Sequence, residues 1–185
     1  MAKWANDSGE VSIKIAVIGQ PGSGKGSILR HLATSQGQAA VRTGVISETE
    51  VVRTEFIWTA PPLIDGPFVR VKVFALSGKP LHQAAEQLIL HECDTLVFVV
   101  DCDPLHIVDS GNSLLALTTN ATHVGLNWEG AVVVMQYNRA ERYPNMKPGE
   151  IDAWLGVEDG KVARYITASN SSENLNVAVI DAWKR

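Results

Sequence analysis

Hydrophobic and polar positions alternate along this chain in a way that predicts an α/β domain. Apolar, valine-rich runs, typical of strands covered on both faces, recur between stretches with helical spacing. The predicted strands are Ser12–Ile18, Arg53–Thr59, Val69–Leu76, Thr95–Asp101, Ala131–Tyr137 and Ala163–Thr167. The predicted helices are Lys25–Thr34, Leu81–Glu92, Ser110–Ala121, Pro148–Leu155 and Ser171–Trp183. This order favours a doubly wound, mainly parallel sheet of six strands flanked by helices.

The segments between these elements refine the prediction. Gln36–Glu50 is polar, contains glycine and lacks a clear period, so we expect a mobile loop there. Proline and glycine in residues 61–67 indicate a turn that makes the strands on either side of it antiparallel neighbours. Residues 1–10 form a polar tail, and residues 11–185 are expected to form one domain.

Composition narrows the function classes. The 185 residues carry a net charge of −4, which argues against nucleic acid as a partner. The longest apolar run, Leu96–Val100, is too short to span a bilayer, and the polar start does not resemble a signal peptide. We therefore expect a cytoplasmic protein without a transmembrane segment. Cys93 and Cys102 lack metal-ligand spacing and are interpreted as core residues.

A glycine-rich segment between the first strand and the first helix predicts a phosphate-binding loop. Its sequence, GQPGSGKGS, matches the P-loop pattern G-x-x-x-x-G-K in the strand–loop–helix context that the pattern requires. Glycines let backbone N–H groups surround an anion, the helix directs its positive end at it, and the lysine adds a cation. The candidate nucleotide-binding residues here are Gly19, Gly22, Ser23, Gly24, Lys25, Gly26 and Ser27.

One position of this loop departs from the pattern. The residue after the lysine normally carries the hydroxyl that binds Mg²⁺, but here it is Gly26. Ser27 follows one place later and is the remaining candidate metal ligand in the loop. We therefore expect Mg²⁺ to be weakly held.

The segment Val132–Arg142, with the sequence VVVMQYNRAER, carries a resemblance to a known family. It is similar to the strand and guanine-reading motif, Gln-Tyr-Asn-Lys-x-Asp, of the bacterial gliding-motility (MglA-type) group of Ras-like small GTPases. The resemblance runs from about Ile13 to Arg185. It implies a P-loop NTPase fold and GTP or GDP as ligand. Asn138 and Glu141 would read the base, Arg139 would pack on it, and the loop with Ala168 and Ser169 would add a backbone contact.

The switch regions of this family are only partly retained. Arg53 and Thr54 match the Arg-Thr of the first switch, which implies an arginine acting on the γ-phosphate and a threonine helping to hold Mg²⁺. Lys79 stands where the family has the glutamine that orients the attacking water. The resemblance thus implies a switch or scaffold with slow or absent GTP hydrolysis, and a roadblock-type (MglB-like) regulatory partner.

Two alternatives stay open at this point. Adenylate kinases and related nucleoside monophosphate kinases also have glycine after the P-loop lysine, and Ile64–Arg70 is similar to their Asp-Gly-Phe-Pro-Arg signature. However, no arginine or lysine lies between Asp101 and Met135, where a kinase needs cations around the transferred phosphate. The other alternative is a scaffold that no longer binds nucleotide.

Overall fold

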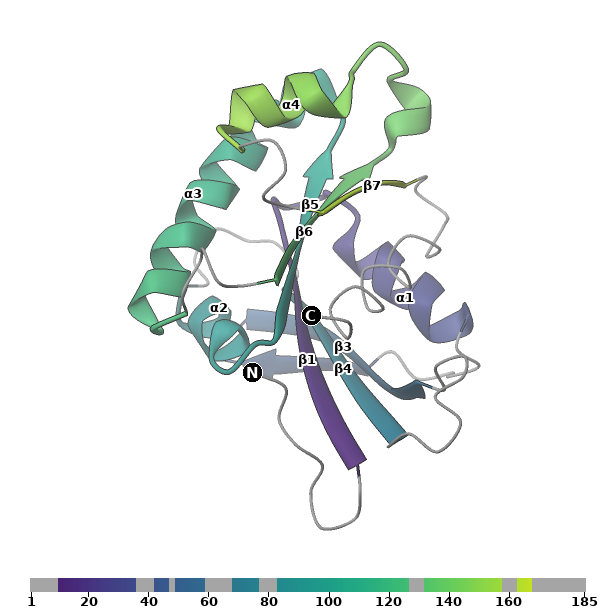
Figure 1. Ribbon diagram of the computed structural model, residues 1–185, viewed down its shortest axis with the longest axis vertical. Helices are drawn as coiled ribbons and strands as arrows, with labels where there is room; N and C mark the ends of the chain where they lie inside the picture. The colour runs from purple at the N-terminus through teal and green to yellow at the C-terminus, as the bar shows by residue number, and fades with distance from the viewer. Residues whose placement is uncertain are drawn as a thin grey trace.

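The computed structural model describes residues 10–35, 42–46, 49–58, 68–76, 83–126, 132–157 and 163–167. They form one mixed sheet with helices on both faces (Figure 1). In spatial order the strands are β2 (Arg42–Ile46), β3 (Thr49–Trp58), β4 (Phe68–Leu76), β1 (Glu10–Ile18), β5 (Thr95–Asp101), β6 (Val132–Asn138) and β7 (Ala163–Thr167). Strands β4, β1, β5, β6 and β7 run parallel, whereas β3 is antiparallel to both β2 and β4.

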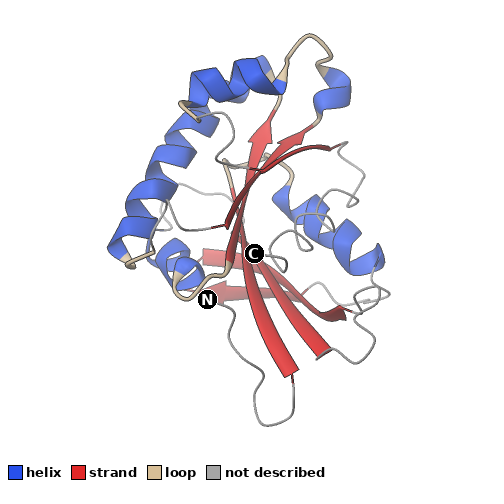
Figure 2. Ribbon diagram, viewed as in Figure 1, coloured by secondary structure: helices blue, strands red, loops and turns tan. Residues whose placement is uncertain are grey.

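The helices cover the sheet from two sides. They are α1 (Lys25–Ser35), α2 (Gln83–Leu90), α3 (Ile107–His123) and α4 (Pro148–Leu155), with short 3-10 turns η1 (Pro104–His106) and η2 (Ala140–Arg142). Helix α1 lies on one face, and α2 and α3 lie on the other (Figures 1 and 2). The α/β fold with a helix-flanked parallel sheet, expected from the sequence, is confirmed.

The structure corrects the predicted number of strands and one predicted loop. Among the described residues the sheet has seven strands, not six, because part of the segment Gln36–Glu50 forms β2 and the start of β3. The sequence of β2, RTGVI, shows no period, and its extended form comes from antiparallel pairing with β3. The antiparallel pairing of β3 with β4 is confirmed. The predicted tail, the turn in residues 61–67 and the helix Ser171–Trp183 lie largely or wholly outside the described residues.

Apolar side chains explain why the central strands are fixed. All seven residues of β5 are buried. The core on the α2 and α3 face includes Ala85, Ile89, Phe98, Leu117 and Met135, while Ile28, Leu29 and Leu32 bury the inner face of α1. Burying a leucine, isoleucine, phenylalanine or methionine side chain fully contributes about 1.5–3 kcal/mol to the free energy of folding. This packing holds the carboxyl ends of β1, β5 and β6 at one edge of the sheet.

The C-terminal end of α2 shows how a polar residue completes this packing. Lys14 of β1 donates from Nζ to the carbonyl oxygens of Leu88 (3.2 Å) and His91 (2.6 Å). A cation at this end of a helix compensates the helix dipole and the unpaired carbonyls. Glu92 then takes a positive φ of 54°, so the helix ends before it. Among the described residues, no helix is long and apolar enough to cross a membrane.

Candidate functional site

The loop between β1 and α1 needs its glycines for two separate reasons. Gly22 and Gly24 have φ values of 78° and 98°, which other residues rarely adopt. The loop also packs closely against its surroundings. A Cβ on Gly19 would lie 2.4 Å from the carbonyl oxygen of Val99, and one on Gly24 would lie 2.2 Å from Nδ2 of Asn138. Positions 19 and 24 therefore have no room for a side chain, and the loop approaches its neighbours there through its backbone.

Lys25 is buried at the start of α1 and is held by the loop itself. Its Nζ donates to the carbonyl oxygens of Gly19 (2.7 Å) and Gln20 (2.5 Å) and to Oγ of Ser23 (3.4 Å). Burial lowers the pKa of Lys25 to about 8, and the charge of Glu86 on α2 acts in the opposite direction. A buried ammonium whose hydrogen-bond partners are neutral oxygens gains from an added anion, which would offset its desolvation.

The first turn of α1 offers backbone donors beside this lysine. The N–H groups of Ser27 and Ile28 both bond to the carbonyl oxygen of Gly24, at 3.0 Å each, which closes the turn. The N–H groups of the two preceding helical residues belong to the helix start, where no intrahelical acceptor exists. The loop thus combines free donors, a helix N-terminus and a cation.

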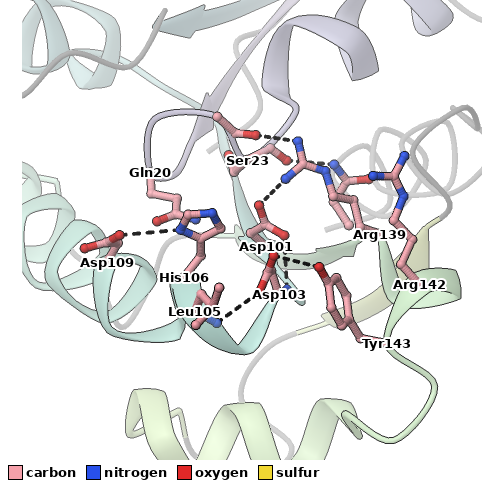
Figure 3. Close-up of polar contacts among 12 residues, drawn as sticks. Gln20, Ser23, Asp101, Asp103, Leu105, His106, Asp109, Arg139, Arg142 and Tyr143 are labelled. Atoms are coloured by element: carbon pink, nitrogen blue, oxygen red, sulfur yellow. Dashed lines mark hydrogen bonds and ion pairs between the residues drawn. The ribbon is translucent and has the colours of Figure 1, made fainter.

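The end of β6 lies directly against this loop, although the two are far apart in the sequence. Asn138 is buried, and its Nδ2 donates to the carbonyl oxygen of Ser23 at 2.7 Å across 115 positions. Arg139 follows in a left-handed conformation, with φ of 65°. One arm of its guanidinium donates to the carbonyl oxygen of Gly22 at 2.8 Å, and the other forms an ion pair with Asp101 (Figure 3).

The loop after β5 completes the arrangement. Asp101 is 1% exposed at its side chain and also accepts the backbone N–H of Asp103 at 3.1 Å. Asp103 accepts the hydroxyl of Tyr143 at 2.6 Å (Figure 3). That hydrogen bond lowers the pKa of Asp103 and raises the pKa of Tyr143. Burial, helped by the charge of Asp101, raises the pKa of Cys102 to about 12, which disfavours the thiolate form.

The side chains at the start of α1 do not offer Mg²⁺ a free hydroxyl ligand. Gly26 offers no side chain, and the hydroxyl of Ser27 accepts a hydrogen bond from Nη2 of Arg30 at 3.4 Å. Within the described ranges, no group of three or more histidine, cysteine, aspartate or glutamate side chains is placed to hold a metal. We therefore derive no chemistry through a loop-bound metal.

Comparison with models of known protein families and with curated proteins gave no match. The function must therefore be argued from the geometry of the loop and of the end of β6.

The structure brings together most of the predicted site residues that it describes. Residues 19–27 of the loop meet Asn138 and Arg139. Glu141 lies in η2, with its Oε1 at 3.8 Å from Nε of Arg142 and a side chain 43% exposed. Two contributors were missed by the sequence analysis: Asp101, which ends a predicted strand, and Arg30, which stands one helical turn beyond Gly26.

The remaining predicted residues are not tested by the structure. Arg53 and Thr54 lie in β3, opposite residues of β4, but their side chains fall outside what is described. Lys79, Ala168 and Ser169 lie outside the described residues altogether.

Proposed function

We propose that this protein is a Ras-like P-loop protein that binds guanine nucleotide and acts as a switch or scaffold. The observation that carries the proposal is the contact of Asn138 and Arg139 with the loop at Ser23 and Gly22. Two motifs separated by more than half of the chain meet at the carboxyl edge of the parallel sheet, where α/β folds bind ligands. The resemblance assigns phosphates to one motif and a base to the other, and their contact fits a single nucleotide.

The phosphate half is supported by the chemistry of the loop. Lys25 is a buried cation, and the first turn of α1 supplies backbone donors beside it. An anion in this position gains charge-assisted hydrogen bonds and the field of the helix dipole. The close approach of the Asn138 amide to Gly24 leaves no room for a side chain at position 24.

The proposed binding of a guanine base is supported by the unpaired acceptor of Asn138 and the nearby carboxylate of Glu141. Oδ1 of Asn138 is buried without a hydrogen-bond partner among the described residues. Glu141 lies three positions further on, in the turn that follows β6. Guanine presents an N–H and an NH₂ group on one edge, so a carboxylate that accepts from both favours guanine over adenine.

The proposed activity is binding with slow or absent GTP hydrolysis. Gly26 has no hydroxyl to bind Mg²⁺ directly, so the metal is proposed to be weakly held, with Ser27 and Thr54 as its candidate ligands. Lys79 cannot accept a hydrogen bond from an attacking water as glutamine does. Arg53 remains the candidate cation for the γ-phosphate. A roadblock-type regulatory protein is the proposed partner.

Mass analysis of nucleotide released from the purified protein tests this proposal. GDP or GTP in near-stoichiometric amount is the expected result for the wild type. Lys25→Ala should retain little nucleotide, because the loop then loses the cation that faces the phosphates. Recovery of adenine nucleotides instead would point to the kinase alternative, and a folded, nucleotide-free protein that takes up none would point to the scaffold.

A further inference from the structure

The guanidinium of Arg30 lies beside the position where Gly26 lacks a side chain. The two residues are one helical turn apart on α1, and long side chains on a helix lean toward its N-terminus. A Cβ on Gly26 would lie 3.7 Å from Nη1 and 3.8 Å from Nη2 of Arg30. Nη2 also donates to Oγ of Ser27. The guanidinium therefore reaches back over the first turn of the helix.

This is an unfavourable place for a cation unless an anion binds there. The start of a helix carries partial positive charge, which destabilises a nearby cation. Helix α1 has no acidic residue in its first turn, and Lys25 already adds a positive charge there. Within the described residues, the guanidinium has one hydrogen-bond partner, the neutral hydroxyl of Ser27.

A second observation marks the same loop as a ligand site. Asn138 is 1% exposed and packs its amide against Ser23 and Gly24, yet its Oδ1 has no partner among the residues that the structure describes. A buried acceptor of this kind destabilises the folded protein unless a donor reaches it. A ligand that carries anionic groups and a hydrogen-bond donor would pair with both features, the two cations at the start of α1 and the unpaired acceptor of Asn138.

We propose that Arg30 binds the nucleotide phosphates in place of Mg²⁺, so that nucleotide binding does not depend on a divalent metal. In a P-loop the hydroxyl one residue after the lysine holds the Mg²⁺ that bridges the β- and γ-phosphates. Here that residue is Gly26, and a guanidinium stands over it. A guanidinium can donate two parallel hydrogen bonds to phosphate oxygens. This inference rests on the proposed nucleotide binding.

The test is a titration of fluorescent GTP and, separately, of inorganic tripolyphosphate, each with millimolar Mg²⁺ and with excess EDTA. The wild type should bind each ligand with affinities that differ less than about threefold between the two conditions. Arg30→Ala, an exposed substitution that favours helix, should lose about 10- to 100-fold in EDTA because a charge-assisted contact is removed. Lys147→Ala, which removes an equal charge from the exposed N-cap of α4, should change affinity less than about twofold.

A double variant supplies the converse test. Gly26→Ser in the Arg30→Ala background restores a hydroxyl, and its Cβ fits because Gly26 has an ordinary backbone conformation. This variant should regain affinity in Mg²⁺ but not in EDTA. GTP binding by the wild type that collapses in EDTA, or that Arg30→Ala leaves unchanged, would overturn the role of Arg30 and leave the proposed function standing. Failure to bind either ligand would overturn both, whereas Arg30-dependent binding of tripolyphosphate alone would overturn only the nucleotide assignment.

Discussion

The ion pair between Arg139 and Asp101 gives a quantitative prediction of stability. The Asp101 side chain is 1% exposed, whereas that of Arg139 is 28% exposed. Arg139→Met roughly keeps the side-chain volume, but among the described residues it leaves the buried carboxylate with one hydrogen-bond donor, the backbone N–H of Asp103. Breaking a buried pair in this way costs about 3–5 kcal/mol, and because water reaches part of the guanidinium we expect the lower end, about 3 kcal/mol.

A double-mutant cycle separates the pair from the loss of packing. Asp101→Asn leaves a cation that water can reach, so it should cost less than Arg139→Met. Combining the two should recover at least about 1 kcal/mol relative to the sum of the single variants. The assay is urea unfolding followed by far-UV circular dichroism, with unchanged m-values as the condition for comparison.

Arg142→Met is the matched control for this cycle. Its guanidinium pairs with Glu141 at 3.8 Å, and the two side chains are 63% and 43% exposed. Exposed pairs of this kind contribute about 0–1 kcal/mol. If Arg139→Met costs no more than Arg142→Met, or if the coupling energy is near zero, the structural role assigned to the Arg139–Asp101 pair is wrong.

Three further predictions concern the loop. Gly24→Ala should nearly abolish nucleotide binding, because its Cβ would lie 2.2 Å from the side-chain amide of Asn138. A Cβ on Gly22 meets nothing within 4 Å, so Gly22→Ala should lower the free energy of unfolding by only about 1–3 kcal/mol, measured by urea unfolding, through backbone strain. The pKa of Lys25 is lowered from 10.5 to about 8, so GTP affinity should fall by up to about tenfold per pH unit above pH 8, where the lysine loses its charge. The free energy of unfolding should rise between pH 8 and 10.5, because the unfolded chain binds the proton more tightly there. Lys25→Ala should remove both trends. Gly26→Thr with Lys79→Gln should raise single-turnover GTP hydrolysis above a slow wild-type rate, and a variant that loses activity would contradict this reasoning.

The sequence predicted the parts of the site that local pattern encodes. Glycine spacing, the lysine and the flanking hydrophobic periods located β1, the loop and α1 within one or two residues, because each requirement acts between near neighbours. Strand β2 could not be found in this way. Residues Arg42–Ile46 include Gly44 and lack a period, and their extended conformation depends on pairing with β3.

Contacts between segments that are far apart in the chain could not be predicted from the sequence pattern either. Nothing near Arg139 in the sequence indicates that it pairs with Asp101, 38 positions away, or that it reaches Gly22. The position of Arg30 was accessible in principle, because residues four apart on a helix are neighbours and Gly26 leaves the space between them empty. The spacing of Gly26 and Arg30 predicts a role for Arg30 only once Gly26 is recognised as the position where a P-loop normally has its metal ligand.

Competition against fluorescent GDP tests the central claim most directly. Unlabelled GTP, ATP and AMP are titrated against the preformed complex of the wild-type protein. We predict that GTP displaces GDP at a similar concentration, and that ATP and AMP need at least about 100-fold more, because a site built for the guanine edge leaves polar groups unpaired with adenine. Equal competition by ATP, or tighter binding of AMP, would contradict the guanine assignment and support the kinase alternative.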